Sequence, residues 1–350
     1  MDNANILLLL YGFLAVLIGG SEANVSGVQK LFVFGDSYAD TGNLGKLDRS
    51  LTRCWYEPYG MSFPRKPTGR FSDGKVLSDF IASFIGIRSP VPYKFRRRVS
   101  SDLLKYGMNF AVSGTGVFDL GNFQRNLSAQ VDTFQGQINE SVYTKYDIQS
   151  SIALVTISGN DYHQLFDKNC TRNEILDYIK NVTDNLKLEL KRIHNLGVNK
   201  VLVTNLTPLG CAPLVTRKYN YKGCDKTKGL AVEGHNMNLN AAVYQLNAKK
   251  NSISSDFVVL DLHSAFLSII NQEKGARKFN HIFRPCCEGK LESFSCGQVN
   301  DEGVEQYSLC RDPSEYLYWD SVHPSQAGWD AVFQQIKPFL YKTLEEELRF

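Results

Sequence analysis

The sequence predicts an α/β fold in which helices cover both faces of one parallel sheet. Short apolar runs have the length of strands, and they lack the alternation of apolar and polar residues that a half-exposed strand shows. Longer segments with apolar residues at helical spacing separate these runs. Polar and glycine-rich segments follow several of the runs, which is where ligands bind in parallel sheets.

Four apolar runs predict buried strands, and a fifth segment has weaker strand character. The four runs are 31–34, 152–157, 200–204 and 257–260, and the weaker segment is 108–112. Because these strands alternate with helical segments, we expect them to pair in parallel. No long linker interrupts the pattern, so a single domain is the simplest organisation.

The clearest predicted helix begins after Thr171. Glu174 lies three residues later, which matches a capping box. Apolar residues then recur at helical spacing as far as Ile193, and Gly197 provides a stop. Weaker helical patterns cover 230–248 and 325–348, the second with Ser325 as a candidate N-cap.

Length and composition are those of an ordinary globular protein. The chain has 350 residues, of which 43% are hydrophobic and 21% are charged. No repeat of about 20 to 50 residues is present, which disfavours a solenoid or a propeller. The formal net charge of +3 is too small to predict a polyanionic partner, so we expect no nucleic-acid binding.

The N-terminus resembles a secretory signal. Residues 6–18 form a nearly unbroken apolar run, shorter than the about 20 residues of a membrane span. Ser21 and Ala23 fit the small-residue rule for cleavage. We therefore predict a signal peptide at 1–23, a secreted single domain at 24–350, and no stable membrane anchor after cleavage. A membrane anchor or a buried helix is the alternative, because no Lys or Arg precedes the run.

Secretion favours disulfides and glycans. The chain has eight cysteines, and the four between 286 and 310 suggest a cross-linked loop, with the pairing left open. Asn-x-Ser/Thr triplets predict N-glycosylation. A triplet at Asn205 ends an apolar run, so we expect this side chain to face inward. The remaining candidate sites are Asn24, Asn126, Asn139, Asn169 and Asn181.

A small polar turn follows the first predicted strand. Gly35 permits a sharp bend, and Ser37 then lies at the carboxyl end of the strand. If a helix begins here, its free backbone amides favour negative charge that develops beside Ser37. The alternative is that Ser37 only caps a helix.

Two further polar positions follow predicted strands. Asn160 follows 152–157 and offers a side-chain amide, and Gly114 follows 108–112 and offers an unobstructed backbone amide. Together with the Ser37 amide they form a candidate oxyanion hole. Each position is weak by itself, because Asn and Gly are common in loops.

Near the C-terminus, Asp320 precedes His323 by three residues. Such a pair can hydrogen-bond, with Asp320 accepting Nδ1–H of His323 and Nε2 left to take a proton from Ser37. Pro324 restricts His323 to an extended backbone, and the predicted helix after Ser325 anchors the loop. An isolated Asp-x-x-His is also typical of a surface turn.

Taken in order, these segments resemble the four blocks of the GDSL (SGNH) hydrolase family. Two further segments, 67–74 and 205–211, resemble its plant esterase/lipase branch, and the similarity covers about residues 30–342. The resemblance implies a three-layer, flavodoxin-like α/β/α sandwich with a mostly parallel sheet of about five strands. The four blocks are Gly35-Asp-Ser37, Asn109-Phe-Ala-x-x-Gly114, Gly159-Asn-Asp161 and Asp320-x-x-His323.

By matching position, the resemblance also implies roles. Ser37 resembles the nucleophile, His323 the base and Asp320 its orienting acid, while Gly114 and Asn160 resemble the oxyanion donors. The implied function is a secreted esterase or lipase that acts on small-molecule or lipid esters without a metal or cofactor. Tyr38 stands where the family usually has leucine. Since the amide there is backbone, we expect catalysis to persist and the ring to alter local packing.

Two other interpretations fit parts of the sequence. An α/β-hydrolase needs Gly-x-Ser-x-Gly, but Ala39 occupies the last position here, and the acid lies just before His323 and not on a distant loop, so we reject that fold. A catalytically weak or inactive binding protein on the same scaffold is the other, since a fold does not determine function. The presence of all five candidate residues favours the enzyme.

The aromatic stretch 55–63 fits either an acyl groove or packing in the core or around a disulfide of Cys54.

Overall fold

The computed structural model describes residues 27–121, 126–162, 170–248 and 255–345. The predicted signal peptide, Asn24 and Asn169 lie outside these residues. Within these ranges, no helix combines the length and the apolar character that crossing a membrane requires.

Six parallel strands form the central sheet in the order β2-β3-β1-β4-β5-β6. All five predicted strands are present, and the sixth is a two-residue edge strand that is too short to show a pattern. Without it the order is that of flavodoxin-like sheets. The strands are β1 (Lys30–Gly35), β2 (Val91–Pro92), β3 (Gly107–Asn109), β4 (Ser151–Thr156), β5 (Lys200–Thr204) and β6 (Phe257–Leu260).

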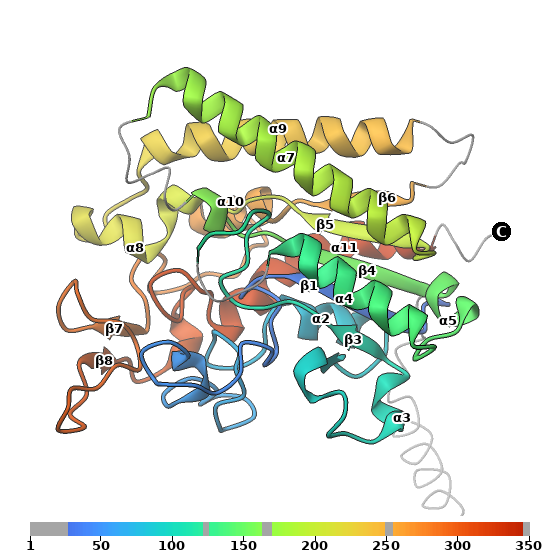
Figure 1. Ribbon diagram of the computed structural model, residues 1–350. Coiled ribbons are helices and arrows are strands. Elements are labelled where there is room, and N and C mark those ends of the chain that lie inside the picture. The colour runs from blue at the N-terminus through green and yellow to red at the C-terminus, as the bar shows by residue number, and fades with distance from the viewer. Residues whose placement is uncertain (1–26, 122–125, 163–169, 249–254, 346–350) are drawn as a thin grey trace, which may run out of the picture.

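Helices cover both faces of this sheet, which confirms the three-layer α/β/α arrangement (Figure 1). Helices α4, α7 and α9 pack on one face, and α2, α10 and α11 pack on the other. The α-helices among the described residues are α2 (Leu77–Phe84), α3 (Ser101–Leu104), α4 (Leu127–Asn139), α5 (Lys145–Gln149), α7 (Arg172–Asn195), α8 (Pro213–Thr216), α9 (Lys226–Asn247), α10 (Leu262–Ile270) and α11 (Gln326–Glu345).

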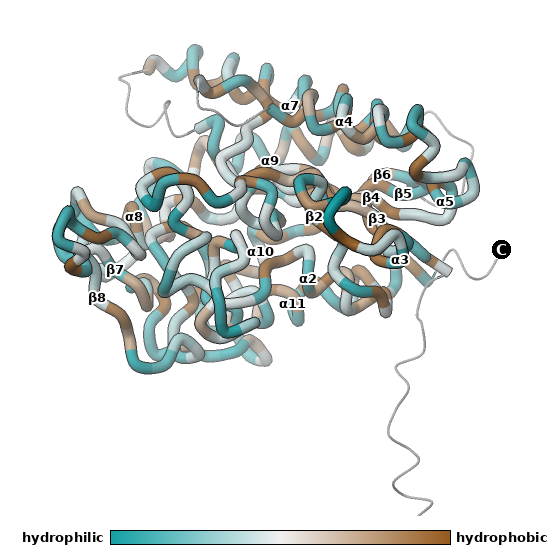
Figure 2. The backbone as a smooth tube through the Cα atoms, turned by 60° about the horizontal axis from the view of Figure 1, so that its bottom comes forward, coloured by the Kyte–Doolittle hydropathy of each residue, from teal (hydrophilic) through white to brown (hydrophobic). Residues whose placement is uncertain are grey.

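Strand β1 shows why the runs are apolar throughout. Leu31 and Val33 contribute to the core under α2, α10 and α11, whereas Phe32 and Phe34 contribute to the core under α4, α7 and α9. All four side chains are fully buried. Brown segments accordingly lie among the labelled strands of the sheet in Figure 2. Burial on both faces removes the polar positions that would otherwise alternate with apolar ones.

The predicted helices are confirmed in detail at α7. The Thr171 hydroxyl accepts a hydrogen bond from the Glu174 amide, and the Glu174 carboxylate accepts one from the Thr171 amide. Gly197 follows the helix with a φ of +106°, the left-handed conformation that favours glycine. The two weaker patterns correspond to α9 and α11.

A small antiparallel hairpin carries two of the disulfides. Strands β7 (Cys287–Gly289) and β8 (Tyr307–Leu309) pair with each other outside the main sheet (Figure 1). Disulfides Cys286–Cys310 and Cys287–Cys296 confirm the predicted cross-linked loop, and a third bridge joins Cys211 to Cys224. Cys54 is a buried free thiol, so packing around a Cys54 disulfide is the wrong interpretation of the aromatic stretch.

Three of the predicted glycosylation sites fall on described residues. Asn139 and Asn181 are exposed, and the side-chain oxygen of Asn126 caps α4 by accepting from the Ala129 amide at 3.0 Å. Asn205 is 5% exposed and donates to Asp261 at 2.7 Å. The prediction that Asn205 faces inward is therefore confirmed.

The end of β1 tolerates no side chain. Gly35 has a φ of +121°, and an added Cβ would lie 1.9 Å from the carbonyl oxygen of Thr156 in β4. We expect Gly35→Ala to lower the free energy of unfolding by at least about 2 kcal/mol, measured by urea denaturation. Gly136→Ala in α4, where a Cβ meets nothing within 4 Å, is the control and should gain about 0.5–1 kcal/mol. Equal stability of Gly35→Ala and the wild type would contradict this account.

Candidate active site

Ser37 lies in a single turn directly after β1. The Asp40 amide donates to the carbonyl oxygen of Asp36 at 2.9 Å, which closes the turn. The Asp40 carboxylate then accepts the backbone N–H groups of Gly42 and Asn43, both at 2.7 Å, and turns the chain into a loop. The helix considered for this position is therefore absent, and a hydrogen-bonded turn takes its place.

The structure joins Ser37, His323 and Asp320 by hydrogen bonds. Ser37 Oγ lies 2.9 Å from His323 Nε2. His323 Nδ1 lies 2.8 Å from Asp320 Oδ1 and 2.9 Å from Oδ2. All three residues are buried, with exposed fractions of 7%, 9% and 4% respectively. Ser37 lies near the N-terminus of the sequence, and Asp320 and His323 lie near its C-terminus. The fold brings these three residues together at the carboxyl edge of the sheet.

Asp320 is held in its ionised form. Burial alone raises its pKa, but the nearby charge of His323 and hydrogen bonds from the His323 side chain outweigh it. The backbone N–H groups of Val322 and His323 also donate to this carboxylate. The pKa of Asp320 is therefore lowered to about 2, and the carboxylate is charged at neutral pH.

Local hydrogen bonds explain why the Asp320 loop has this shape. The Trp319 amide donates to the carbonyl oxygen of His323 at 2.8 Å, which closes the loop. Ser325 accepts from the Gly328 amide at 2.9 Å, so it caps α11 as predicted. The Cys287 amide donates to the carbonyl oxygen of Trp319 at 2.7 Å. The loop is thus fixed between a helix and the disulfide-bonded hairpin.

Tyr38 connects the Ser37 turn to the His323 loop. Its ring is 5% exposed and packs edge-on against Trp329, with ring centroids 4.9 Å apart. Its hydroxyl donates to the carbonyl oxygen of Val322 at 3.3 Å. The tyrosine that replaces the usual leucine therefore adds a polar contact between the two loops that carry Ser37 and His323.

Asp36 belongs to the site, although sequence reasoning gave it no role. It is fully buried, and its carboxylate accepts from the Ser158 amide at 2.6 Å, the Ser158 hydroxyl at 2.7 Å and the Tyr38 amide at 3.1 Å. Burial outweighs these hydrogen bonds and raises the pKa of Asp36 to about 6. The sequence did offer one signal for this role, because Asp36 lies between Gly35 and the candidate nucleophile Ser37.

Asn160 lies beside this carboxylate, but its amide hydrogens are engaged. Its Nδ2 donates to the Thr115 carbonyl oxygen at 2.9 Å and to Asp36 Oδ2 at 3.2 Å. A side-chain amide carries two hydrogens, so each has an acceptor. Gly114, with a φ of +87°, immediately precedes Thr115 in the loop after β3. Asn160 thus contacts Asp36, and Gly114 lies one residue before the carbonyl group that Asn160 binds. The role of both as oxyanion donors stays a prediction.

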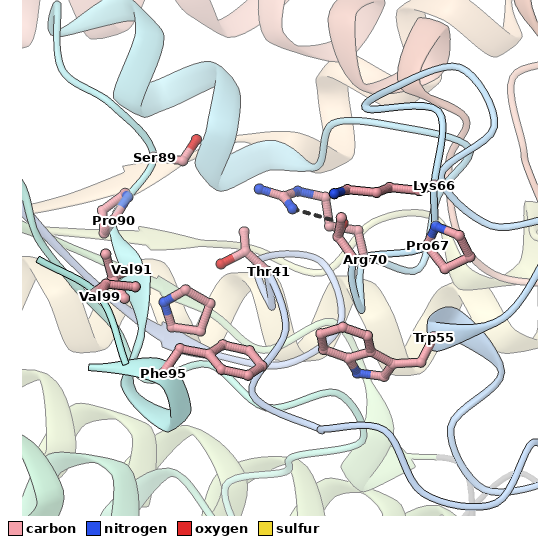
Figure 3. A pocket seen from close by; sticks show the side chains of 12 residues that line it. Thr41, Trp55, Lys66, Pro67, Arg70, Ser89, Pro90, Val91, Phe95 and Val99 are labelled. Atoms are coloured by element: carbon pink, nitrogen blue, oxygen red, sulfur yellow. Dashed lines mark hydrogen bonds between the residues drawn. The ribbon is translucent and has the colours of Figure 1, made fainter. Parts of the chain in front are cut away.

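A pocket opens beside β2 (Figure 3). Its volume is about 510 Å³, which is within the usual range for small-molecule sites. The walls are mainly apolar, with the rings of Trp55 and Phe95 lying 5.9 Å apart. Arg70 also lines it, but Asp79 neutralises the guanidinium at 2.7 and 2.8 Å. Trp55 therefore fits the expectation of a groove, whereas Tyr59 from the same stretch is buried in the core.

The described parts of the chain contain no group of three or more His, Cys, Asp or Glu residues arranged to hold a metal ion. At the site, Asp320 pairs with His323, and the Asp36 carboxylate accepts hydrogen bonds from Ser158, the Tyr38 amide and Asn160. The arrangement of Ser37, His323 and Asp320 is suited to moving the proton of the hydroxyl to the imidazole.

A family model described as GDSL-like Lipase/Acylhydrolase matches residues 31–336. The chain belongs to this family. It is 40% identical over 319 residues to GDSL esterase/lipase At5g03610 of Arabidopsis thaliana, covering 90% of this chain and 88% of that protein. It is 38% identical over 347 residues to GDSL esterase/lipase At3g09930 of the same plant, covering 96% and 97%. This GDSL hydrolase is a carboxylic ester hydrolase.

Among solved structures, the chain is similar to phospholipase A1 from Streptomyces albidoflavus NA297. The sequence identity is 13% and the TM-score is 0.37, over 89% of this chain and 99% of the other. The fold assignment follows from the strand order and layers described above.

The raised pKa of Asp36 predicts a pH dependence of stability. An ionised Asp36 costs folding free energy, because its pKa is about 6 in the folded protein against an ordinary value of 3.8. The cost is present above pH 6 and is relieved as the pH falls towards 4, since the folded protein binds the proton first. We expect the wild type to gain about 2 kcal/mol relative to Asp36→Asn between pH 7 and pH 4, measured by urea unfolding. A difference that stays constant over this range would contradict the assignment.

Proposed function

We propose that this GDSL hydrolase cleaves carboxylic esters through an acyl-enzyme on Ser37. The hydrogen-bonded chain of Ser37, His323 and Asp320 is the observation that carries the proposal. Ser37 Oγ attacks the ester carbonyl while His323 Nε2 accepts the hydroxyl proton. The ionised Asp320 stabilises the imidazolium that forms and keeps Nδ1–H pointing towards its carboxylate.

The second half of the reaction uses the same residues. His323 gives the proton to the leaving alcohol, whose departure leaves the acyl group on Ser37. A water molecule then donates a proton to His323 as it attacks the acyl carbonyl, and His323 returns that proton to Ser37. These steps need no metal or organic cofactor.

The tetrahedral intermediates need donors for their oxyanion. We assign this role to the backbone amides of Ser37 and Gly114 and to Asn160 Nδ2. The bond from Asn160 to Asp36 is the longest that this carboxylate accepts, at 3.2 Å. We infer that the oxyanion replaces Asp36 as the acceptor of that hydrogen when substrate reacts.

The apolar part of the substrate fits the pocket beside Trp55. Strand β2, whose end lines the pocket, lies two positions from β1 in the sheet. Two strand spacings amount to about 10 Å. None of the three triad residues lines the pocket itself, so we infer that an acyl chain attached to Ser37 must be of at least medium length to reach it. We therefore infer that lipid-like esters, rather than acetyl esters alone, are substrates.

Secretion completes the proposal. We infer that residues 1–23 are removed and that 24–350 form one secreted domain. Three disulfides are typical of oxidising compartments and support this. The exposed Asn139 and Asn181 are accessible to glycosylation, and at Asn126 the cap uses only the side-chain oxygen.

The triad proposal predicts that Ser37→Ala lowers hydrolysis of a short p-nitrophenyl ester by at least about 10⁴-fold, because the attacking oxygen is gone. A fluorophosphonate probe should label the wild type and leave Ser37→Ala unlabelled. The control is Ser308→Ala, which removes an exposed hydroxyl on the hairpin that donates only to Glu288 at 3.3 Å. Undiminished turnover by folded Ser37→Ala would refute the proposal.

The pocket proposal predicts a change in chain-length preference. We expect Trp55→Ala to lower kcat/KM for a long-chain p-nitrophenyl ester about tenfold, with little effect on the acetate ester, because only a long chain reaches the indole. Phe95→Ala should act in the same direction. Tyr244→Ala, which removes a 76% exposed ring on α9, serves as the control. Equal losses on both esters would place the apolar part of the substrate elsewhere.

A further inference from the structure

Asp320 has a partner that the triad does not account for. The hydroxyl of Tyr59 donates to Asp320 Oδ2 at 2.8 Å, from a position 261 residues earlier in the chain. Tyr59 lies in the segment between β1 and α2, outside the motifs that identify the family. The bond is fully buried, since Tyr59 is 1% exposed and Asp320 is 4% exposed.

Tyr59 is held rigidly in this position. Its ring packs edge-on against Phe71 and Trp319, with centroids 5.5 and 5.9 Å away. Phe71 in turn stacks on the His323 imidazole at 4.6 Å with an angle of 25° between the planes. Aromatic packing of this kind restricts side-chain motion. The same cluster therefore braces both members of the Asp320–His323 pair.

The hydrogen bonds of Asp320 divide between its two oxygens. Oδ1 accepts the backbone N–H groups of Val322 and His323, at 3.0 and 2.9 Å, while Oδ2 accepts Tyr59. Nδ1 of His323 lies between the two oxygens. A carboxylate offers about four acceptor positions, so this set fixes the plane of Asp320 and with it the imidazole ring.

Tyr59 acts as a donor under all ordinary conditions. Burial, followed by the negative charge of Asp320, raises its pKa well above the usual value, so the phenol stays protonated. Arg53 and Cys54 are the other ionisable groups that act on it, and burial and the charge of Asp40 raise the pKa of the Cys54 thiol as well. The hydroxyl therefore donates a hydrogen bond that partly neutralises the negative charge of Asp320, and it does not transfer its proton to the carboxylate.

We propose that Tyr59 is a positioning residue that acts through Asp320 on His323. This inference rests on the proposed Ser37–His323–Asp320 triad. The phenol fixes the plane of the carboxylate and moderates its charge. Without the hydroxyl, Asp320 would hold the imidazolium more strongly and orient the ring less sharply.

The test compares Tyr59→Phe with a matched variant, Tyr307→Phe. Tyr307 is 5% exposed, lies in the same hydrophobic core cluster as Tyr59 and donates to the Glu305 carboxylate at 2.9 Å, outside the triad. For Tyr59→Phe we expect kcat to fall about tenfold with KM within about twofold, because a hydrogen bond to a charged acceptor is lost. We also expect the acid limb of the pH–rate profile to move to higher pH. Tyr307→Phe should leave kcat, KM and the acid limb unchanged.

A spectroscopic readout separates positioning from general loosening. The Nδ1 proton of His323 should give a downfield proton NMR resonance that disappears in Asp320→Asn and shifts in Tyr59→Phe but not in Tyr307→Phe. If Tyr59→Phe does not fold, 3-fluorotyrosine at position 59 keeps the shape and makes the phenol a stronger donor. The acid limb should then move to lower pH, and an unmoved limb would overturn the inference.

The outcomes also distinguish this inference from the proposed triad. If Ser37→Ala remains active, the triad proposal fails whatever Tyr59 does. If Ser37→Ala is inactive but Tyr59→Phe matches Tyr307→Phe in kcat, acid limb and resonance, the triad stands and the role of Tyr59 is rejected.

Discussion

The 2.9 Å hydrogen bond between Ser37 and His323 depends on more of the structure than any other contact at the site. It joins residues 286 positions apart, so neither loop can fix it alone. Strands β1 and β4 place the Ser37 turn where the order of the sheet reverses, the point at which flavodoxin-like sheets bind ligands. Helix α11 and the disulfide-bonded hairpin place the His323 loop from the other side. The bond can therefore form only when the sheet, α11 and the hairpin are all in place.

Aromatic side chains supply the contacts between these two supports. Tyr38 reaches from the Ser37 turn to Val322 and Trp329, and Phe71 lies flat on the imidazole of His323. Tyr59 adds a hydrogen bond to the acid of the same pair. Flat rings fill the space between the loops and leave few alternative packings, so a site assembled from distant loops gains the rigidity that orienting a base requires.

Local patterns in the sequence predicted local structure well. The unbroken apolar runs located five strands because both faces of the sheet are covered, and the capping box at Thr171 located the start of α7. The order of the four motifs identified in advance the residues that lie together at the site. The pairing of the cysteines, the two-residue strand β2 and the role of Tyr59 were not predictable, because each depends on contacts across the chain that leave no periodic trace. The absence of a helix after Ser37 has the same cause, since the Asp40 carboxylate redirects the chain through loop contacts. Asp36 was overlooked although it directly precedes Ser37 in the sequence.

The buried Asp36 carboxylate raises a question of charge, since it lies next to the residue on which an oxyanion is proposed to form. A bare carboxylate there would repel the developing charge. Three donors besides Asn160 disperse its charge, namely the Tyr38 amide and the amide and hydroxyl of Ser158. If Asn160 turns one hydrogen to the oxyanion, Asp36 loses only its longest hydrogen bond and keeps the three shorter ones. The proposed exchange therefore transfers one hydrogen bond between two acceptors and leaves no buried charge without a partner, a far smaller cost than an isolated ion would carry.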